Sequence, residues 1–363
     1  MSDIARLNEF GQSPWYDNLA RSLLTGGGLQ SLITDDGIRG VTSNPTIFEK
    51  AMAAGEGYDE QLKACAKDGV SIEDSYWRLV VDDVGNAADL LLPVYEASGG
   101  ADGFVSVEVS PDLAHDTVGT IAQAKSLFDR LGRKNLMIKI PATLEGLPAI
   151  EANIAAGINT NVTLIFSLAR HDKVIDAYLA GLESLVAGGG DPATVSSVAS
   201  FFVSRVDTET DRRLPDSSTL RGKAAVANAR LAYRLFTQRF SGARWDALAA
   251  RGARLQRPLW ASTSTKNPAY SPTMYVDELI GRDTVNTLAP ASIEALQHGE
   301  ANLQGDTVTA DLGGADQVMA DLAAAGVDFD DVTLTLEREG VASFAASFHD
   351  ALATLEQRRA QVG

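Results

Sequence analysis

A lysine stands inside a short apolar run of the sequence, where a charged side chain is costly. In "NLMIKIPAT", at residues 135–143, Lys139 follows Met137 and Ile138 and precedes Ile140. Burying an ammonium group without compensation is unfavourable, so burial favours the neutral amine. A neutral amine can attack a ketone or aldehyde and form a Schiff base. The run therefore predicts either a nucleophile or a structural lysine that is ion-paired or has its amine at the strand end.

Two carboxylates occupy comparable places in two other apolar runs. Asp17 lies in "WYDNL" and Glu108 lies in "VSVEVS". Two carboxylates that face one amine can transfer protons and balance its charge when it is protonated. Taken alone, either residue could equally cap a helix or pair with an arginine.

Polar residues in two further segments could bind hydroxyl groups. Asn44 precedes Pro45, which favours extended backbone at Asn44 and could turn its amide into a site, although Asn-Pro is also a turn signal. In "NTNVTLIFS", Asn159, Asn161 and Thr163 alternate with apolar residues, so an extended strand places them on one face. That face predicts a site for hydroxyl groups or water, or a satisfied polar network in the core.

Hydroxyl groups and cations end two more apolar runs. "SFFVSR" ends a predicted strand with Arg205, and "ASTSTKN" ends another with Ser262, Ser264 and Lys266. This combination suits a phosphate group. A single cation on a loop is ordinarily only solvated, so each of these residues is a weak signal by itself.

Eight short apolar runs alternate with amphipathic, helix-length stretches. Such alternation predicts parallel βαβ units, and eight of them close a (β/α)8 barrel. A doubly wound open sheet is the competing fold, but no glycine-rich dinucleotide fingerprint follows the first run. In a barrel, the carboxyl ends of the strands collect the chemistry. The predicted strands lie within residues 14–19, 40–45, 103–109, 135–141, 157–167, 197–206, 258–263 and 283–290.

The chain after about residue 290 has a helical pattern throughout, with a break at 305–309. No linker there is long or polar enough to separate a second domain. We therefore expect one domain over residues 1–363, with the C-terminal helices as an appendage to the barrel or a subunit contact. If these helices form a subunit contact, the protein is a homodimer.

Composition limits the partners of the protein. Its 31 lysines and arginines against 48 aspartates and glutamates give a formal net charge of −17, which argues against nucleic acid or an anionic membrane. A small anion is still allowed, because a few local cations outweigh a distant field. One cysteine and four dispersed histidines predict no metal site. We see no signal peptide or membrane-length apolar run and expect a cytoplasmic protein.

Several segments together resemble the transaldolase family, the Schiff-base enzymes of the pentose phosphate pathway. They are "GVTSNPTIFEKAM", "NLMIKIPATLEGLPAI", "GINTNVTLIFS" and "ASTSTKNPAYSPTMYVDELIGRDTVNTLAP", in the family's order. The similarity runs from about residue 15 to past residue 290, and it implies a single (β/α)8 barrel. The segment that contains "STSTKN" is also similar to the first part of transaldolase–phosphoglucose isomerase fusions. It is typical of a longer bacterial subfamily with a helical C-terminal extension.

The resemblance implies a role for each candidate residue. Lys139 matches the Schiff-base lysine, Asp17 the acid/base aspartate, Glu108 the third-strand glutamate and Thr163 the water-holding threonine. The family's substrate-binding residues match Asn44, Asn161, Ser200, Phe202 and Arg205. The Ser-x-Arg that commonly follows the seventh strand is replaced by "STSTKN". Lys266, helped by Ser262, is therefore the expected phosphate cation.

The implied reaction moves a dihydroxyacetone unit between sugar phosphates, without a metal or organic cofactor. The donor would be sedoheptulose 7-phosphate or fructose 6-phosphate, and the acceptor glyceraldehyde 3-phosphate or erythrose 4-phosphate. A fructose-6-phosphate aldolase-like enzyme would release free dihydroxyacetone instead. Phe202, where such aldolases tend to have a tyrosine near the lysine, and the chain length favour transfer. A sugar-phosphate-binding barrel with a structural lysine is the second alternative.

Overall fold

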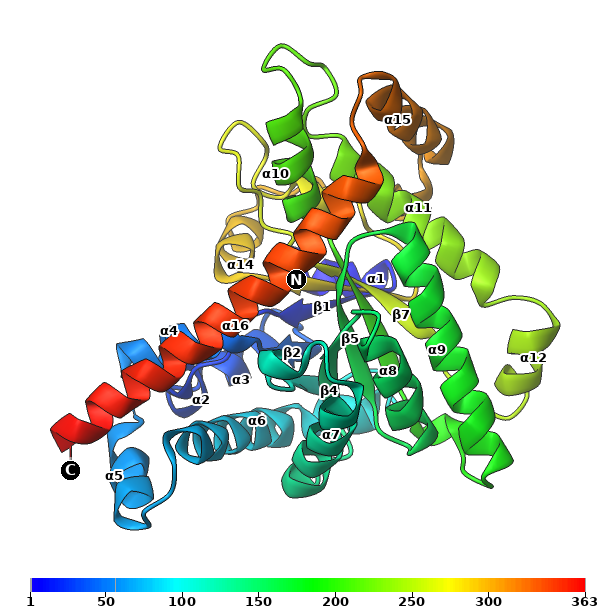
Figure 1. The fold of residues 1–363 in the computed structure, drawn as a ribbon. Coiled ribbons are helices and arrows are strands. Elements are labelled where there is room, and N and C mark those ends of the chain that lie inside the picture. The colour runs from blue at the N-terminus through cyan, green and yellow to red at the C-terminus, as the bar shows by residue number, and fades with distance from the viewer. Residues whose placement is uncertain (1, 56, 363) are drawn as a thin grey trace.

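Eight parallel strands close into a barrel in chain order, as Figure 1 shows. The computed structural model describes residues 2–55 and 57–362. The ring is completed by β1 and β8, which pair from Gln12 opposite Thr284 to Tyr16 opposite Leu288. The (β/α)8 barrel expected from the sequence is confirmed. The strands are β1 (Gln12–Tyr16), β2 (Gly40–Thr42), β3 (Phe104–Glu108), β4 (Leu136–Pro141), β5 (Thr160–Ile165), β6 (Ser197–Phe202), β7 (Gln256–Ala261) and β8 (Thr284–Leu288).

Helices surround the barrel and cover one of its ends (Figure 1). Because the helices bury the outer face of each strand, nearly every strand residue is inaccessible to solvent. The helices are α1 (Asp3–Glu9), α2 (Arg21–Thr25), α3 (Gly28–Thr34), α4 (Pro45–Ala54), α5 (Asp59–Lys67), α6 (Ile72–Ala97), α7 (Thr117–Leu131), α8 (Gly146–Ala155), α9 (Leu168–Ala187), α10 (Ser204–Arg213), α11 (Ala224–Arg239), α12 (Ala243–Ala249), α13 (Met274–Asp277), α14 (Pro290–Gln297), α15 (Leu312–Ala324) and α16 (Phe329–Val362). Short 3-10 turns are η1 (Pro111–Leu113), η2 (Pro192–Thr194) and η3 (Thr307–Thr309).

The predicted strands are all present, but all except β4 end earlier than expected, and in β1 and β6 this moves a candidate residue out of the strand. β1 ends at Tyr16, so Asp17 follows the strand instead of lying within it. β6 ends at Phe202, and Val203 already has a helical backbone conformation (φ −107°, ψ −75°). The prediction that Arg205 ends a strand is therefore wrong, because Arg205 lies in the first turn of α10.

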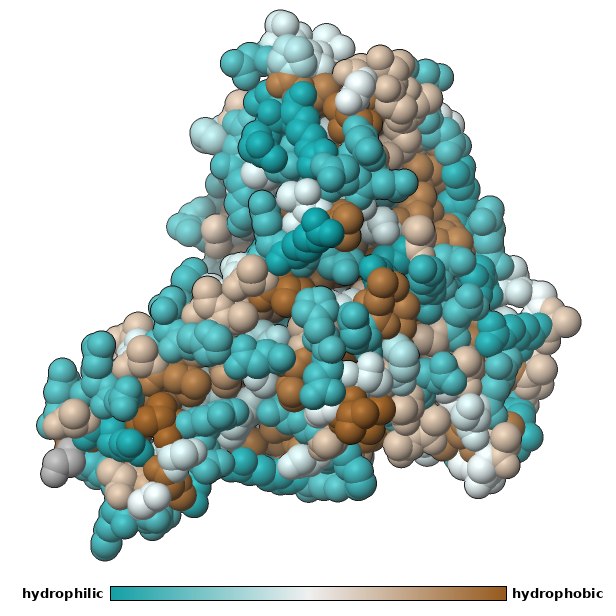
Figure 2. Space-filling model, viewed as in Figure 1, coloured by the Kyte–Doolittle hydropathy of each residue, from teal (hydrophilic) through white to brown (hydrophobic). Residues whose placement is uncertain are grey.

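The C-terminal region is less continuously helical than the sequence indicated. The chain between α14 and η3 is not helical, and it ends with Asp306 in the left-handed region (φ 60°). Beyond it, the long helix α16 crosses the barrel in front of the strands and packs against α4, α5, α6 and α10 (Figure 1). In Figure 2 the outward side of α16 is mostly hydrophilic. None of the described helices is long and apolar enough to cross a membrane.

Candidate active site

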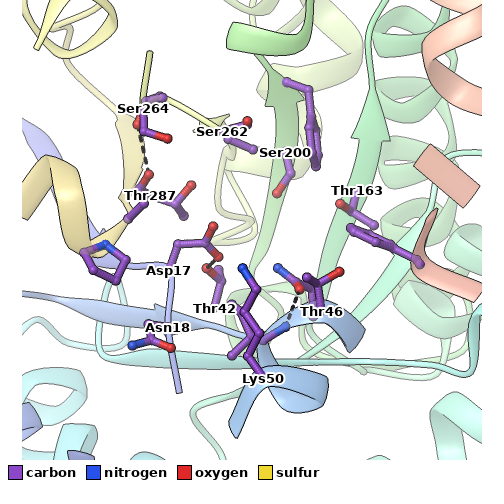
Figure 3. Close-up of a pocket in the computed structure, with 18 of the residues that line it drawn as sticks. Asp17, Asn18, Thr42, Thr46, Lys50, Thr163, Ser200, Ser262, Ser264 and Thr287 are labelled. Atoms are coloured by element: carbon purple, nitrogen blue, oxygen red, sulfur yellow. Dashed lines mark hydrogen bonds between the residues drawn. The ribbon is translucent and has the colours of Figure 1, made fainter. Parts of the chain in front are cut away.

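A cavity of about 540 Å³ opens at the carboxyl ends of the barrel strands. Figure 3 shows side chains from several strand ends and from α4 pointing into this common space. Most of the candidate residues from the sequence line it; Glu108, Asn159 and Asn161 do not. Those that line it are Asp17, Asn44, Lys139, Thr163, Ser200, Phe202, Arg205, Ser262 and Lys266.

Lys139 and Glu108 form a buried pair at the base of the cavity. They lie opposite each other in the β3–β4 register, which places both side chains on the same face of the sheet. Lys139 Nζ lies 3.4 Å from Glu108 Oε2 and 3.3 Å from the backbone oxygen of Ser43, to which it donates. Lys139 is 5% exposed and Glu108 is 6% exposed. The amine therefore has little access to water.

The environment of Glu108 suits proton transfer near neutral pH. Burial raises the pKa of this carboxyl group to about 7, against the opposing effect of Lys139, while Asp17 raises the pKa slightly further. A group with a pKa near the working pH can donate and accept protons in turn. Glu108 can therefore serve as both acid and base toward a ligand on Lys139.

Asp17 approaches the cavity from the end of β1. Its Oδ1 accepts a 2.7 Å hydrogen bond from Thr42 Oγ1 at the end of the neighbouring strand β2. Figure 3 shows the carboxylate turned toward the centre of the cavity. The hydrogen bond orients Asp17 and leaves an oxygen free for a ligand.

A bulge in β5 directs Thr163 at the site. The β5–β6 register shifts between Val162 and Ile165, and Leu164 has a positive φ of 59°. Bulges re-aim side chains and are common beside active sites. Thr163 Oγ1 is buried and has no hydrogen-bond partner among the described residues. It is therefore available to a water molecule or a substrate.

Amide and hydroxyl side chains form part of the wall. Ser200 Oγ donates to Asn161 Oδ1 at 2.6 Å, and Asn161 Nδ2 donates to Ser106 Oγ at 3.0 Å. Asn161 thus holds Ser200 from behind. Asn44 Oδ1 caps α4 by accepting from the Ile47 amide, which leaves the Asn44 NH₂ group for the cavity.

Asn159 does not belong to the site, although the sequence placed it on one face with Asn161 and Thr163. Its Nδ2 donates to the backbone oxygens of Lys134 and Leu136, and its Oδ1 accepts from the Ser196 amide. These partners lie at the amino end of β5. Asn159 therefore satisfies backbone groups far from the cavity.

Besides Lys139, three basic side chains line the cavity, although the chain as a whole is acidic. Arg205, Lys266 and Lys50 each point to it, and within residues 2–55 and 57–362 none has a carboxylate at ion-pair distance. Burial lowers the pKa of Arg205, whose guanidinium lies 5.5 Å from the centre of the Phe202 ring. Loss of solvent lowers the pKa of Lys266, and Arg205 and Lys50 lower it further. Such mutual repulsion favours an anion between them.

Ser262 and Lys266 lie at the end of β7. Ser262 has a positive φ of 57°, and its hydroxyl is 2.9 Å from that of Ser204. Lys266 Nζ donates to Ser264 Oγ at 2.9 Å. No group of three histidine, cysteine, aspartate or glutamate side chains in the described part of the chain is arranged to hold a metal.

Residues 14–355 match the family described as Transaldolase/Fructose-6-phosphate aldolase. The chain belongs to this family. A "Transaldolase 1" of Streptomyces avermitilis is 52% identical over 97% of this chain and 94% of its own length. A "Transaldolase" of Thermobifida fusca is 50% identical over 99% of both chains. A "Transaldolase" of Mycobacterium ulcerans is 50% identical over 96% of this chain and 95% of its own length.

These findings confirm the resemblance and the enzyme class expected from the sequence. The protein is an enzyme of the transaldolase type, within the longer bacterial group. The matched residues run from within β1 through β8 and include most of α16. The roles of individual side chains rest on the geometry described above.

Several residues of this transaldolase-family site escaped the sequence analysis, among them Thr42, Lys50 and Phe344. Lys50 reads as an ordinary helical lysine, yet it lies four residues after Thr46 and so shares its face of α4. That spacing from the "SNPT" segment could have revealed it. Phe344 comes from α16, and its ring centre lies 5.7 Å from Lys139 Nζ. No local pattern connects Phe344 with the lysine, because only the fold brings α16 over the strands.

Proposed function

We propose that the protein transfers a dihydroxyacetone unit between sugar phosphates through a Schiff base on Lys139. The observation that carries this proposal is a buried amine 3.4 Å from a carboxyl group whose pKa is raised to about 7. The amine lines an open cavity whose cations have no carboxylate partners in the described structure. A purely structural lysine would need no cavity beside it.

Formation of the Schiff base uses Lys139, Glu108 and Thr163. The neutral amine attacks the ketone carbon of fructose 6-phosphate or sedoheptulose 7-phosphate. The resulting carbinolamine loses water to give the imine. Glu108 shuttles the protons through a water molecule held by Thr163 Oγ1, which has no other partner in the described structure.

Cleavage of the carbon–carbon bond uses Asp17. Its carboxylate, oriented by Thr42, takes the proton from the hydroxyl group next to the bond that breaks. The aldose leaves as glyceraldehyde 3-phosphate or erythrose 4-phosphate. The iminium accepts the electron pair of the broken bond and becomes an enamine, which then attacks the aldehyde of the second aldose.

Binding is divided between two groups of side chains. Asn44 and Ser200, the latter held by Asn161, bind the hydroxyl groups of the three-carbon unit beside Phe202. Arg205 and Lys266, with Ser262 and Lys50, bind the phosphate. The absence of carboxylate partners in the described structure supports this role, because an unpaired cation in a cavity is available to an anion.

The direct test traps the adduct. We expect incubation with fructose 6-phosphate and borohydride to add the three-carbon or whole-sugar fragment to Lys139, detected by peptide mass spectrometry. Lys134, an exposed lysine paired with Glu96, serves as the internal control and should stay unmodified. An unmodified Lys139 under conditions where the sugar is bound would refute the Schiff base and support a binding protein.

A second measurement separates transferase from aldolase, since the family includes both activities. With fructose 6-phosphate and erythrose 4-phosphate together, we expect sedoheptulose 7-phosphate as the main product. Free dihydroxyacetone as the main product would support the aldolase.

We also propose a cytoplasmic location and a homodimer. Analytical ultracentrifugation tests the assembly, and a single-chain mass would exclude the dimer.

A further inference from the structure

We propose that Phe344 of α16 keeps bulk water from protonating the enamine formed on Lys139 and thereby sets how often the three-carbon unit is transferred instead of released. This inference rests on the proposed Schiff-base function and gives the C-terminal helix a role in the site. It makes residue 344 a determinant of reaction outcome.

Phe344 closes the side of the cavity that the barrel leaves open. Its side chain is 4% exposed and lines the cavity, with the ring centre 5.7 Å from Lys139 Nζ. Phe202 contributes a second ring from β6. An apolar ring at this distance occupies space that water would otherwise fill next to the nitrogen.

Gly340 allows α16 to lie close to the strands. A Cβ atom there would come within 2.9 Å of Leu164 Cδ2 and 3.8 Å of Arg205 Nη1. Leu164 belongs to the β5 bulge beside Thr163. The helix therefore approaches the site one turn before Phe344, at a position where a larger side chain would push it away.

Contacts on both sides of Phe344 hold the ring in place. Ser347 Oγ lies 2.8 Å from Thr46 Oγ1 on α4, and Glu337 pairs with Arg170 on α9 at 3.0 Å. Phe348 meets Tyr76 of α6 edge-on, with ring centres 5.1 Å apart. α16 is thus held by contacts with α4, α6 and α9, which surround the carboxyl end of the barrel.

The reaction that Phe344 would suppress has a defined course. After the aldose leaves, the enamine on Lys139 accepts a proton at the carbon that lost the aldose and becomes an iminium. Water adds to the iminium carbon, and its proton loss gives a carbinolamine. The carbon–nitrogen bond then breaks, and free dihydroxyacetone and neutral Lys139 are released. Water also hydrolyses the product imine at the end of transfer. The step that belongs to release alone is therefore the protonation of the enamine carbon, which bulk water supplies when it reaches that carbon.

The experiment compares release with transfer in four proteins. Fructose 6-phosphate and erythrose 4-phosphate are supplied together, and the ratio of free dihydroxyacetone to sedoheptulose 7-phosphate is measured for wild type, Phe344→Ala, Phe344→Leu and Leu355→Ala. Leu355 is buried on the same helix but does not line the cavity, so its variant controls for a loosened helix. Phe344→Leu keeps most of the volume and remains informative if the alanine variant fails to fold.

We expect the release ratio to rise about tenfold in Phe344→Ala and about threefold in Phe344→Leu, with Leu355→Ala close to wild type. Ratios for both Phe344 variants within about twofold of wild type would overturn the inference and leave Phe344 as a packing residue. Borohydride trapping of the wild type separates this failure from that of the proposed function. An adduct on Lys139 with unchanged ratios refutes only the role of Phe344, whereas no adduct refutes both.

Discussion

The two ends of the barrel differ in how their charged side chains are paired. At the amino ends of the strands, Asp102 accepts hydrogen bonds from Ser13 and from Trp15 Nε1 and pairs with Arg257 at 3.3 Å. Asn135 there donates to two backbone oxygens, although its own Oδ1 has no hydrogen-bond partner in the described structure. At the carboxyl ends, Arg205, Lys266 and Lys50 line the cavity, and none of them has a carboxylate at ion-pair distance among the described residues.

This contrast separates residues that stabilise the fold from residues that are available to a ligand. A cation that pairs with a carboxylate of the protein contributes to the fold, whereas a cation in a cavity without such a partner is available to an anion. In (β/α)8 barrels the amino end contributes stability and the carboxyl end contributes chemistry. We therefore expect substitutions at the two ends to change different measured quantities.

The largest expected effect is on the reaction rate, and it follows from a substitution in the cavity at the carboxyl ends of the strands. Lys139→Arg keeps a positive charge but removes the nucleophilic amine, so kcat/KM should fall by about 10⁴-fold or more while the thermal midpoint changes little. A coupled assay with Lys134→Arg as the control measures this. Substantial residual turnover by Lys139→Arg would contradict the role of the lysine.

The next largest expected effect is on stability, and it follows from a substitution at the amino ends of the strands. Asp102→Ala leaves Arg257 and the Trp15 indole without their carboxylate, and should lower the free energy of unfolding by about 3 kcal/mol. The kcat/KM of the folded enzyme should stay within about threefold of wild type, since the cavity is untouched. Denaturant unfolding and the transfer assay test both halves. A large loss of activity with unchanged stability would reverse the assignment of the two ends.

The pH dependence of the free energy of unfolding should further distinguish the carboxyl end of the barrel, where Glu108 lies. The folded-state pKa of Glu108 is raised from 4.5 to about 7, chiefly by burial. Its contribution to stability is therefore fully present below about pH 4.5 and is lost as the pH rises to about 7. Relative to Glu108→Gln, the wild type should lose up to about 3 kcal/mol of unfolding free energy between pH 4.5 and pH 8. Parallel stability curves for the two proteins would show that the carboxyl is not perturbed.

The smallest expected effects concern the phosphate cations. Lys266→Ala and Lys50→Ala should each raise KM for fructose 6-phosphate about tenfold, equivalent to about 1.4 kcal/mol, with little change in stability. Lys125→Ala is the control, because Lys125 pairs with Asp129 away from the cavity. Unphosphorylated fructose should show no such change. Equal losses for both sugars would place the lysines elsewhere in the binding site.

Local sequence was enough to locate the strands. Each is short, apolar and followed by a helical pattern, and these signals depend only on neighbours in the chain. Their ends were less predictable: Asp17 follows β1 and Arg205 begins α10, because hydrogen bonding to adjacent strands determines where a strand stops. The helical prediction after residue 290 failed between α14 and η3. There Asn302 donates to Asp277 of α13, in the connection between β7 and β8, so a contact remote in the chain holds this segment.

The sequence by itself determined the fold class, the family and the candidate lysine, since an amine inside an apolar strand is visible without coordinates. Only the tertiary structure decided which groups face that amine. The 3.4 Å approach of Glu108 and the raised pKa of its carboxyl depend on strand register and burial. Lys50 and Phe344 line the cavity from helices that are remote from Lys139 in the chain, so only the folded structure brings them to the site.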